Sequence, residues 1–573
     1  YRSARVEPRL SITPDCDDAV VSFYVNKGPR SIVTEVVVRG NAMVEAALLR
    51  EFSPIQAGDF FSANEANLGA RRIREFYNER GYLDASATVS VIEFGADTQV
   101  CPYDCVRLVY EVNEGPRAVA CCIAVIGQTI TREGAIRRFL DFEEGDLLTP
   151  KLLRDTERDL YATGAFREVV VRATAVPGAD VTARNVSVRV SETRPLTLFY
   201  GLGYSTDNGP RAEIQLTNNN LFGRLISGSL KLRGSGDDQL AQMQLTDWRP
   251  WGKKWPTTFS AFYNRDADLR PFRRRRLVDD DIEPGSTGQS FGVNRFVSFV
   301  QTQRKLSERT LIRFRYSFEN AKLFDLENIP EIEVTRNERA IRLGMLSAGF
   351  THDSRDNALQ PTRGLLYSAD YSLAARVLGG NESFNKFFGN HQRYYTLPRL
   401  GGSTIAMSAR LGLGQLFRIT DRDGDGIISE PERRLPINER FFAGGATTLR
   451  GFRFEEAGPH GVLEPRNSNE LPTLVPIGGD ALMIFNFELR FPLTRRWSLV
   501  SFYDWGNVFR GVSDISFAGM TNSVGLGLRF NTPIGPVGVD YGYLLDPPFF
   551  ITASGATLRQ PRGAFHLRFG QTF

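Results

Sequence analysis

The strongest constraint on the fold of this chain is an alternation of apolar and polar residues that begins near residue 195 and continues to the C-terminus. In the first such segment, Leu198 and Tyr200 lie on one face of the expected strand, and Gly201 and Gly203 lie on the other. A period of two is typical of β-strands. Because the polar faces are rich in glycine and isolated charges, the pattern favours a closed barrel with a polar lumen over a soluble sandwich.

The number of strands and the lengths of their connections indicate a transmembrane barrel over residues 194–573. We expect about sixteen antiparallel strands, an even number as in bacterial outer-membrane barrels. Residues 269–285 and 324–337 are long connections, whereas 218–223 and 531–536 are tight turns. This asymmetry is typical of a barrel whose short turns face the periplasm. No run of about 18 apolar residues is present, so transmembrane helices are not expected.

The first part of the chain contains an internal repeat. The sequence VNKGPRSIVTEVVVRGN from Val25 recurs as VNEGPRAVACCIAVIGQ from Val112, a period of 112 − 25 = 87 residues. Repetition of this length indicates a small domain that is used more than once. Each copy is expected to have the order β-α-α-β-β, with helices at 44–52 and 63–80 in one copy and at 132–142 and 150–163 in the next. The predicted domains are 31–115 and 116–193.

Residues 1–30 resemble only the last two strands of a preceding copy, so we expect further copies upstream. The five cysteines all lie at or before Cys122. Cys101 and Cys105 flank the Pro-Tyr-Asp turn of an expected hairpin, which is consistent with a disulfide in an oxidising compartment. Two free thiols are the alternative.

Charge and composition exclude several classes of function. The net charge of +4 is too small to indicate nucleic-acid binding. The arginine run at 273–276 is followed by acidic residues at 279–281, and both self-neutralised charge and a lipopolysaccharide contact stay open. Four dispersed histidines, without a nucleophile elbow, a phosphate loop or a zinc motif, indicate that the chain is not an enzyme.

One segment, residues 439–459 (ERFFAGGATTLRGFRFEEAGP), has the composition of neither a strand nor a solvated loop. It combines phenylalanines with paired glycines and an Arg-Gly-Phe triplet, and it lies in the longest connection, residues 418–480. We therefore expect this connection to fold inward and to pack inside the barrel.

The repeats and four motifs carry a family resemblance. The β-α-α-β-β order and the Gly-Pro-Arg junctions resemble POTRA domains. GGATTLRGF, FELRFP from Phe487, FYDWGNVF from Phe502 and the terminal FGQTF together resemble the BamA/TamA superfamily of outer-membrane assembly factors. The resemblance covers nearly the whole chain, and the GQTF ending favours the BamA-type branch. It implies POTRA domains followed by a 16-stranded transmembrane β-barrel, located in the outer membrane of a Gram-negative-type bacterium.

The resemblance further implies that the Arg-Gly-Phe tip is held by acidic residues on the inner wall. The strand parity agrees, because Glu488 and Asp504 lie on polar faces. A guanidinium in a partly dehydrated lumen needs a carboxylate partner. We therefore expect Arg450 to bind Asp504 with Glu488 nearby, Gly451 to permit close backbone approach, and Phe452 to complete the anchor.

The resemblance also implies a function. In the family, the first and last strands form a weak lateral seam, which here would involve Leu198, Tyr200, Gly201, Gly203, Phe569, Gly570 and Phe573. The implied activity is insertion of outer-membrane proteins through this seam without nucleotide hydrolysis. The implied partners are unfolded outer-membrane clients, periplasmic or lipoprotein accessory subunits, and outer-membrane lipid, with no nucleic acid.

Several alternatives stay open at this point. A TamA-type translocation and assembly factor and a two-partner secretion exporter share the expected architecture. A passive channel would need neither the repeats nor the inward-folded loop. The repeats themselves could bind partner strands by β-augmentation or serve as rigid spacers.

The sequence DRDGDGIISEPE from Asp421 matches the spacing of a calcium-binding loop. The expected ligands are Asp421, Asp423, Asp425, the carbonyl of Ile427, Ser429 and a bidentate Glu432. A strand precedes the motif and a proline-containing loop follows it, so an EF-hand helix pair is not expected. The prediction is a single structural Ca²⁺ at the extracellular surface, and an ordinary acidic loop is the alternative.

Overall fold

The computed structural model describes the chain except for residues 1–4, 13–18, 28–29, 95–103, 206–208, 236–237, 273–288, 325–339, 359, 420, 422–425, 464–472, 495, 533–534, 552–556 and 570–573. It divides into two compact units. The first comprises Tyr1–Pro195 with Phe222–Leu225, and the second comprises Leu196–Leu221 with Ile226–Phe573. Among the described residues, none of the helices has the length and apolar character needed to cross a membrane.

The first unit begins with an antiparallel hairpin, β1 (Arg5–Ile12) and β2 (Ala19–Asn26). One repeat follows as β3 (Ser31–Arg39), α1 (Ala46–Arg50), α2 (Ala63–Glu79), β4 (Ser86–Phe94) and β5 (Asp104–Asn113). The next repeat consists of β6 (Val119–Ile126), α3 (Glu133–Arg137), α4 (Pro150–Tyr161), β7 (Phe166–Ala175) and β8 (Ala183–Glu192). The sheets have the orders β3-β5-β4 and β6-β8-β7, so the predicted β-α-α-β-β arrangement is confirmed.

The first helix of each repeat is shorter than predicted. The α1 helix covers only Ala46–Arg50 of the predicted 44–52, and α3 covers only Glu133–Arg137 of 132–142. Pro54 disfavours helical geometry in the residue before it, and Gly58 adopts a left-handed φ of +98° in the turn that follows. The chain must leave the helix here because residues 59–61 run back along β3, where the Val33 N–H donates to the Asp59 carbonyl.

The long helix α2 shows why the repeat is stable. The Ser62 side chain accepts a hydrogen bond from the Glu65 N–H at 3.4 Å, which caps the first turn. After the helix ends, Gly81 adopts a φ of +87°, the left-handed conformation that favours glycine. Ile73 and Tyr77 are fully buried against the sheet. The face that α2 buries therefore forms the core of this repeat.

Each repeat also carries a carboxylate near the end of its last strand, and we call Glu114 and Glu192 the clasp carboxylates. Glu114 Oε1 accepts the N–H groups of Ala42 and Met43, each at 3.0 Å, and the Tyr77 hydroxyl at 2.7 Å. Burial opposes ionisation of Glu114, but these hydrogen bonds keep its pKa below the ordinary value. The carboxylate thereby ties the turn before α1 to the end of β5.

Glu192 performs the same task in the second repeat. It accepts the N–H groups of residues 129, 130 and 131 at 3.1, 2.9 and 2.7 Å, and the Thr129 hydroxyl at 2.5 Å. Although burial raises the pKa of Glu192, hydrogen bonds from Thr129, Thr131 and the backbone lower it to about 2. The two repeats thus share a polar contact, in addition to their fold, that links the start and the end of each domain.

The cysteines of the first unit fall into two groups. Cys105 is buried and disulfide-bonded, while its predicted partner Cys101 lies outside the described residues. Cys121 and Cys122 are free and exposed on β6, with their sulfur atoms 3.0 Å apart.

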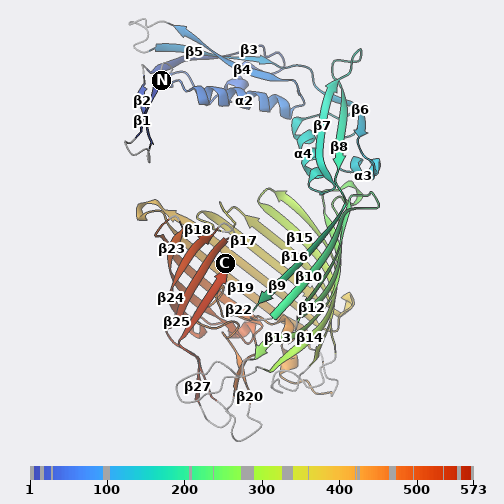
Figure 1. The fold of residues 1–573 in the computed structure, drawn as a ribbon, viewed down its shortest axis with the longest axis vertical. Coiled ribbons are helices and arrows are strands. Elements are labelled where there is room, and N and C mark those ends of the chain that lie inside the picture. Colours follow the sequence, from blue (N-terminus) through green and yellow to red (C-terminus); the bar gives the residue numbers. More distant parts are fainter. Residues whose placement is uncertain are drawn as a thin grey trace. The chain divides into compact units, whose positions relative to one another are not determined.

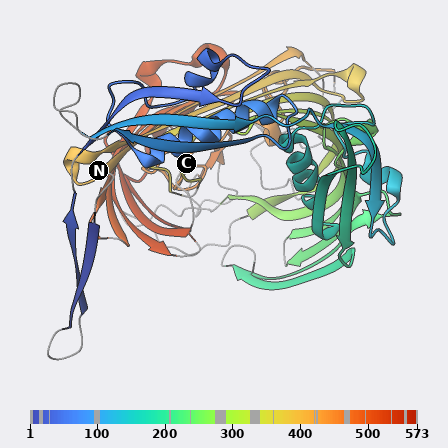
Figure 2. The ribbon, with the colours of Figure 1, turned by 90° about the horizontal axis from the view of Figure 1, so that it is seen from above.

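The second unit is built around one antiparallel sheet of sixteen strands, which confirms the predicted class and number (Figure 1). In chain order the strands are β9 (Leu196–Ser205), β10 (Gly209–Leu221), β11 (Ile226–Ser235), β12 (Asp238–Asp247), β13 (Thr257–Phe272), β14 (Gln289–Ser307), β15 (Thr310–Phe324), β16 (Ile341–Asp353), β17 (Gly364–Ala374), β18 (Ser383–Leu397), β19 (Ser403–Arg418), β22 (Ala481–Pro492), β23 (Trp497–Phe509), β24 (Thr521–Thr532), β25 (Gly535–Leu544) and β28 (Gly563–Phe569). Figure 2 shows this wall curving from the green first strands to the red last strands.

The alternation in sequence becomes an outer and an inner face of the wall. Tyr200, Ile214, Leu232, Ala241 and Tyr263 form one cross-strand row from β9 to β13. The bulky members of this row are exposed on the outer face, as expected for a surface that contacts lipid. The opposite parity points polar groups into the lumen.

The first and last strands, β9 and β28, form the two ends of the sheet. Among the described residues, β9 pairs only with β10, and β28 pairs only with β25. The expected pairing of the first strand with the last is therefore not present in this part of the structure. Outward-facing side chains on both strands are strongly exposed: Tyr200 is 78% exposed and Phe565 is 67% exposed. Gly570 and Phe573, which were expected at this seam, lie outside the described residues.

The connection between β19 and β22 folds back on itself. It contains the short hairpin of β20 (His460–Leu463) and β21 (Thr473–Pro476), and isolated bridges join Phe441 to Gly479 and Ala443 to Ala457. Its apolar residues form one cluster with residues of β22, β23 and β25: Phe441, Ala443, Leu449, Phe452, Ala457, Leu482, Ile484, Val508 and Leu544. The connection thus packs against the inner wall. A second small hairpin, β26 (Phe549–Ile551) and β27 (Thr557–Arg559), precedes β28.

Candidate functional site

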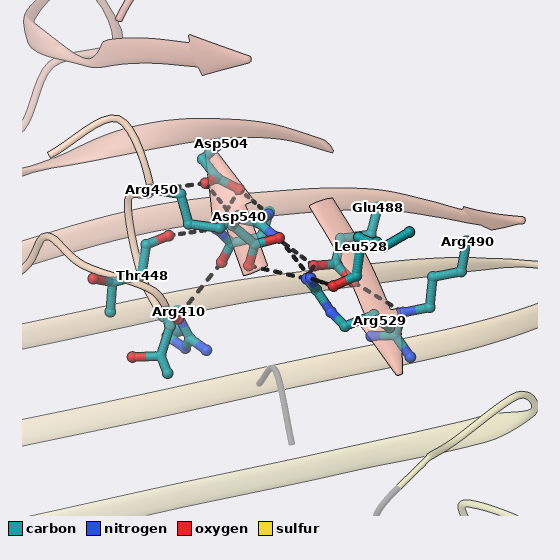
Figure 3. Close-up of polar contacts among 11 residues, drawn as sticks. Arg410, Thr448, Arg450, Glu488, Arg490, Asp504, Leu528, Arg529 and Asp540 are labelled. Carbon is teal, nitrogen blue, oxygen red and sulfur yellow. Dashed lines mark hydrogen bonds and ion pairs between the residues drawn. The ribbon is translucent and has the colours of Figure 1, made fainter. Parts of the chain in front are cut away.

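The site centres on Arg450, at the tip of the connection between β19 and β22, which is only 1% exposed (Figure 3). Its Nε donates to Asp504 Oδ2 at 2.8 Å, and its Nη2 donates to Asp504 Oδ1 at 2.5 Å. Its backbone N–H also donates to Asp504 Oδ2, at 3.0 Å. Asp504 on β23 therefore binds both the guanidinium and the backbone of the tip, which fixes its orientation as well as its position.

Glu488 on β22 is the second carboxylate of this site. It accepts a short hydrogen bond from Arg450 Nη1, and its other oxygen accepts from Arg490 Nε at 2.9 Å. The aromatic ring of Phe502 lies beneath the guanidinium, with the Arg450 Cζ atom 3.6 Å from the ring centroid. The Arg450 guanidinium is thus in contact with two carboxylates and with one aromatic ring, all of which stabilise its charge.

A second ion pair extends the network toward the end of the barrel. Arg529 on β24 donates two parallel hydrogen bonds to Asp540 on β25, at 2.6 and 3.0 Å, and lies 3.9 Å from Glu488 (Figure 3). This pair was not predicted from the sequence. The available signal was parity, because Arg529 shares the polar face of its strand with Gly527. A Cβ atom at Gly527 would lie 1.9 Å from Asp540 Oδ1, so the glycine makes room for the pair.

Two further side chains hold the residues just before the tip. Asn486 Nδ2 donates to the Thr448 carbonyl at 2.6 Å and to Asp504 Oδ1 at 2.8 Å. Arg410 on β19 donates to the Thr447 carbonyl at 2.7 Å. Asn486 and Arg410 both lie on the polar faces of alternating strands. The sequence alone does not show which carbonyl groups of the loop they bind. They add direct hydrogen bonds from the wall to the loop backbone.

Glycines permit the close approach between the tip and the wall. A Cβ atom at Gly451 would lie 2.7 Å from both Leu544 and Ser523. A Cβ atom at Gly542 on β25 would lie 2.2 Å from the Arg450 carbonyl oxygen. Phe452 is 3% exposed and packs in the apolar cluster of the loop. The expected roles of Gly451 and Phe452 therefore have a direct counterpart in the packing, whereas Gly542 was not predicted.

The tip also reaches the last strand. His566 Nε2 on β28 lies 3.0 Å from the Arg450 carbonyl oxygen. Arg450 is therefore bound at two places: its side chain contacts β22 and β23, and its carbonyl contacts β28. This contact of His566 was not predicted, because its partner is 116 positions away in the sequence.

The residues expected to bind calcium are only partly described. The Gly426 N–H donates to Asp421 Oδ2 at 3.0 Å, and Gly426 has a φ of +86°. The Ser429 N–H and hydroxyl donate to Glu432 Oε2 at 2.7 and 2.9 Å. Asp423 and Asp425 lie outside the described residues, as does the charged run at 273–281. Among the residues that the structure describes, no group of three or more acidic, histidine or cysteine side chains is arranged to hold a metal.

The second unit is a sixteen-stranded barrel with a lipid-facing outside and a charged lumen that binds the longest loop of the chain. β-α-α-β-β repeats precede it in the sequence. Together these features define an outer-membrane β-barrel protein with periplasmic repeats. Comparison with known families agrees. The model described as the Omp85 superfamily domain matches residues 220–573, and the model described as the surface antigen variable number repeat, POTRA, matches residues 31–115 and 123–193. The chain therefore belongs to the Omp85 superfamily.

Several of the similar proteins are named outer membrane protein assembly factor BamA. Outer membrane protein assembly factor BamA of Nitratidesulfovibrio vulgaris is 21% identical over 97% of this chain and 64% of its own length. BamA of Neorickettsia risticii is 23% identical over 91% of this chain and 65% of its own length. The crystal structure of BamA from Haemophilus ducreyi lacking POTRA domains 1–3 is similar in fold, with a TM-score of 0.66, 17% identity, and coverage of 94% of this chain and 100% of that one.

These comparisons support the BamA-type branch that the sequence motifs favoured. They also agree with an outer-membrane barrel whose repeats lie in the periplasm. The chain spans about two thirds of the length of the curated relatives that it matches, 64% and 65% for the two given above.

Proposed function

We propose that this chain folds β-barrel proteins into the outer membrane and that it does so at the ends of its own sheet. The observation that carries the proposal is the absence of pairing between β9 and β28 among the described residues. A strand with one free side presents a row of backbone N–H and C=O groups. An unfolded client strand can bind such an edge by β-augmentation.

The proposed mechanism requires no nucleotide. Each hydrogen bond to the template satisfies a backbone group that would be costly in lipid, and each new outward side chain moves apolar surface from water into the membrane. The lumen network contributes by holding the loop tip against β22, β23 and β25, so that the wall next to β28 stays ordered while the edge binds a client. Arg450 and its partners are thus positioning residues in this proposal.

The repeats are proposed to bind clients or periplasmic accessory subunits through their open sheet edges. In both repeats, one outer strand is covered by the turn that follows the first helix: the Phe61 N–H donates to the Ser31 carbonyl, and the Ala120 N–H donates to the Asp146 carbonyl. The opposite outer strands, β4 and β7, pair on one side only within the described residues. They are therefore the edges that we propose for β-augmentation.

The decisive experiment places a photo-crosslinking amino acid at Tyr200 on β9. Tyr263 on β13 is the matched control, because it lies in the same cross-strand row, four strands away, and has the same outer parity. During insertion of a radiolabelled client into proteoliposomes, Tyr200 should crosslink to the client and Tyr263 should not. Equal crosslinking at both sites would contradict templating at the sheet end.

Depletion in cells separates the remaining candidates. Loss of many outer-membrane proteins on depletion supports the assembly role. Loss of one secreted polypeptide, with the other outer-membrane proteins unchanged, would instead favour a two-partner secretion exporter.

We also propose that the loop from Asp421 to Glu432 binds one structural Ca²⁺. Support comes from the complete 12-residue spacing and from two contacts between motif positions: Gly426 N–H to Asp421, and Ser429 to the fully buried Glu432. In that spacing, position 12 supplies a bidentate carboxylate, which needs a fixed side chain such as that of Glu432.

Calorimetric titration of the full chain with Ca²⁺ tests this site. The site is supported if the heat is lost in Asp421→Asn and retained in Asp546→Asn, a control at an exposed acidic residue outside the loop. Equal heats, or none in the parent chain, would identify an ordinary acidic loop.

A further inference from the structure

The outer face of the barrel has a cavity of about 780 Å³ beside the connection between β12 and β13. It lies over strands β14 to β17, which are neighbours in the sheet (Figure 1). Its lining includes Trp251, Trp255, Thr302, Phe314, Ala348 and Tyr371. A cavity of several hundred cubic ångströms is the size that proteins use to bind small molecules. None of the proposed steps of client insertion uses it.

The registers of the strands explain why the wall is hollowed here. Thr302, Phe314, Ala348 and Tyr371 form one cross-strand row, so the short side chains of Thr302 and Ala348 stand between larger ones. The next row repeats the arrangement with bulkier members: Val300, Tyr316, Leu346 and Leu373. Phe314 and Tyr371 are 46% and 45% exposed, as expected for the lipid-facing parity. The result is an apolar groove bounded by aromatic rings.

The connection of residues 248–256 forms one rim of the groove. Trp255 stacks on Phe314, with ring centroids 6.4 Å apart, and the Arg304 guanidinium lies 5.5 Å from the Trp255 ring centroid. Trp251 is 90% exposed and has a φ of 52°, a left-handed conformation that is rare for a bulky residue. A tryptophan held outward at such a cost indicates a use for its exposed ring.

The height of this rim on the barrel is fixed by register. Thr257, the first residue of β13, pairs with Thr302, so β14 continues for several more residues to Ser307 at the periplasmic turn. The rim therefore lies on the outside of the barrel close to its periplasmic end, where the headgroups of the inner leaflet are expected. Tryptophan is enriched at this depth because its ring is apolar and its N–H is polar.

The rim is also basic. Lys253 lines the cavity, and Lys254 follows it in the chain. Arg304 lies near the periplasmic end of β14 and shares the outward parity of Thr302. Glu308 is the acidic residue of the adjoining turn, so the local balance of these four groups is 3 − 1 = +2. Basic residues at this depth attract phosphate-bearing headgroups. The basic rim thus matches the charged headgroup of an amphipathic molecule, and the apolar groove matches its hydrocarbon chain.

We propose that this groove binds one glycerophospholipid of the periplasmic leaflet, distinct from the lipid that surrounds the barrel. An acyl chain lies over Ala348 between Phe314 and Tyr371, and the phosphate lies against Lys253 and Arg304. A protein segment is a poorer match, because the groove opens on the membrane-facing wall and offers apolar surface rather than backbone hydrogen-bonding groups. The proposal depends on the location of the barrel in the outer membrane and not on the assembly activity.

Native mass spectrometry of the full chain released from vesicles containing phosphatidylglycerol tests the headgroup half. We expect one retained lipid in the parent chain and about tenfold weaker retention when Lys253 and Arg304 are both changed to Glu. The matched control is Arg399→Glu combined with Arg376→Glu, which makes the same charge change in two other connections of the barrel. The control should retain lipid as the parent chain does.

Ala348→Phe tests the acyl half without changing charge. It fills the groove and should abolish retention, whereas Ala261→Phe, on the outer face of β13 and outside the cavity lining, should not. Heat-modifiability on gels verifies that each variant folds. Equal retention by the groove variants and their controls would overturn the proposal and identify the cavity as ordinary lipid-contacting surface. Loss only in the charge variant would overturn the acyl placement.

Discussion

Carboxylates in two regions of this chain hold distant segments in place, but with different partners. In the barrel lumen, Asp504 and Glu488 bind the Arg450 guanidinium, and all three side chains are buried. In the second repeat, Glu192 binds three consecutive backbone N–H groups and a hydroxyl at a half-buried position. The lumen therefore pairs opposite charges, whereas the repeat pairs one charge with neutral donors.

The difference determines what happens when a contact is broken. Removal of one charge in the lumen leaves its partner ionised in a site from which water is largely excluded, which is costly. Removal of the charge at Glu192 leaves neutral N–H groups that can turn to nearby water. We expect the same kind of substitution to have a larger effect in the barrel than in the repeats.

Arg450→Ala should have the largest effect. It leaves Asp504 without its bidentate cation and Glu488 with Arg490 as its remaining close cation, at a cost of about 3–5 kcal/mol. The loop tip should become accessible to protease, the barrel should lose resistance to heat, and client insertion should fall. Arg453→Ala is the matched control, because Arg453 is exposed three residues away. Unchanged heat resistance and client insertion in Arg450→Ala would refute the role of this anchor.

Gly542→Ala should come next. The added Cβ would lie 2.2 Å from the Arg450 carbonyl oxygen, which is backbone and cannot move as a side chain does. Overpacking of this kind costs about 3 kcal/mol at the upper end of its usual range. Gly234→Ala on β11 is the control, since a Cβ there meets no atom within 4 Å. Thermal unfolding of the two variants in the same detergent measures the difference, and equal midpoints would show that the tip can withdraw from β25 freely.

Glu192→Gln should have a moderate effect of about 1.5–2 kcal/mol, because a neutral amide oxygen accepts the same N–H groups less strongly. Hydrogen exchange of the intact chain should show faster exchange for the amides of residues 129–131. Glu168→Gln, on the exposed face of β7, should leave this segment unchanged. Slow exchange in Glu192→Gln would mean that the turn is held by packing alone.

The same carboxylate predicts a pH dependence with a definite sign. Its pKa in the folded chain is about 2, below the ordinary value of 4.5. The ionised group therefore stabilises the fold above pH 4.5, and this contribution is lost as the pH falls toward 2. Protection of residues 129–131 should decrease over that range in the parent chain, after correction for intrinsic exchange, and should be flat in Glu192→Gln. A parallel decrease in both would assign the pH dependence to another group.

The sequence predicted one side of this comparison better than the other. Arg450, Asp504 and Glu488 came from strand parity together with a family motif, and parity is preserved in any regular strand. The pair of Arg529 and Asp540 was missed because it joins two strands diagonally, and the relative register of neighbouring strands is not visible in either strand alone.

The clasp carboxylates were missed for a related reason. Glu192 lies more than sixty residues from its partners, which are backbone groups and carry no sequence signal. The first helices were predicted too long because an amphipathic period continues past the turn that returns the chain to the sheet edge. The period of the apolar residues and the parity of the strands were thus sufficient to predict the fold class. The contacts between separate elements could be identified only from the structure.

Tyr77→Phe should have the smallest effect and separates the two repeats from each other. Glu114 receives the Tyr77 hydroxyl at 2.7 Å, whereas Glu192 receives a threonine hydroxyl. Loss of the Tyr77 hydroxyl leaves both backbone donors of Glu114 in place, so the cost should be about 0.5–1 kcal/mol. Burial and the Glu114 carboxylate together raise the pKa of Tyr77, so its hydroxyl stays protonated as a donor. Hydrogen exchange should quicken at residues 42–43 and stay unchanged at 129–131. An equal change at both places would show that the two clasps are coupled through the first unit rather than acting one per repeat.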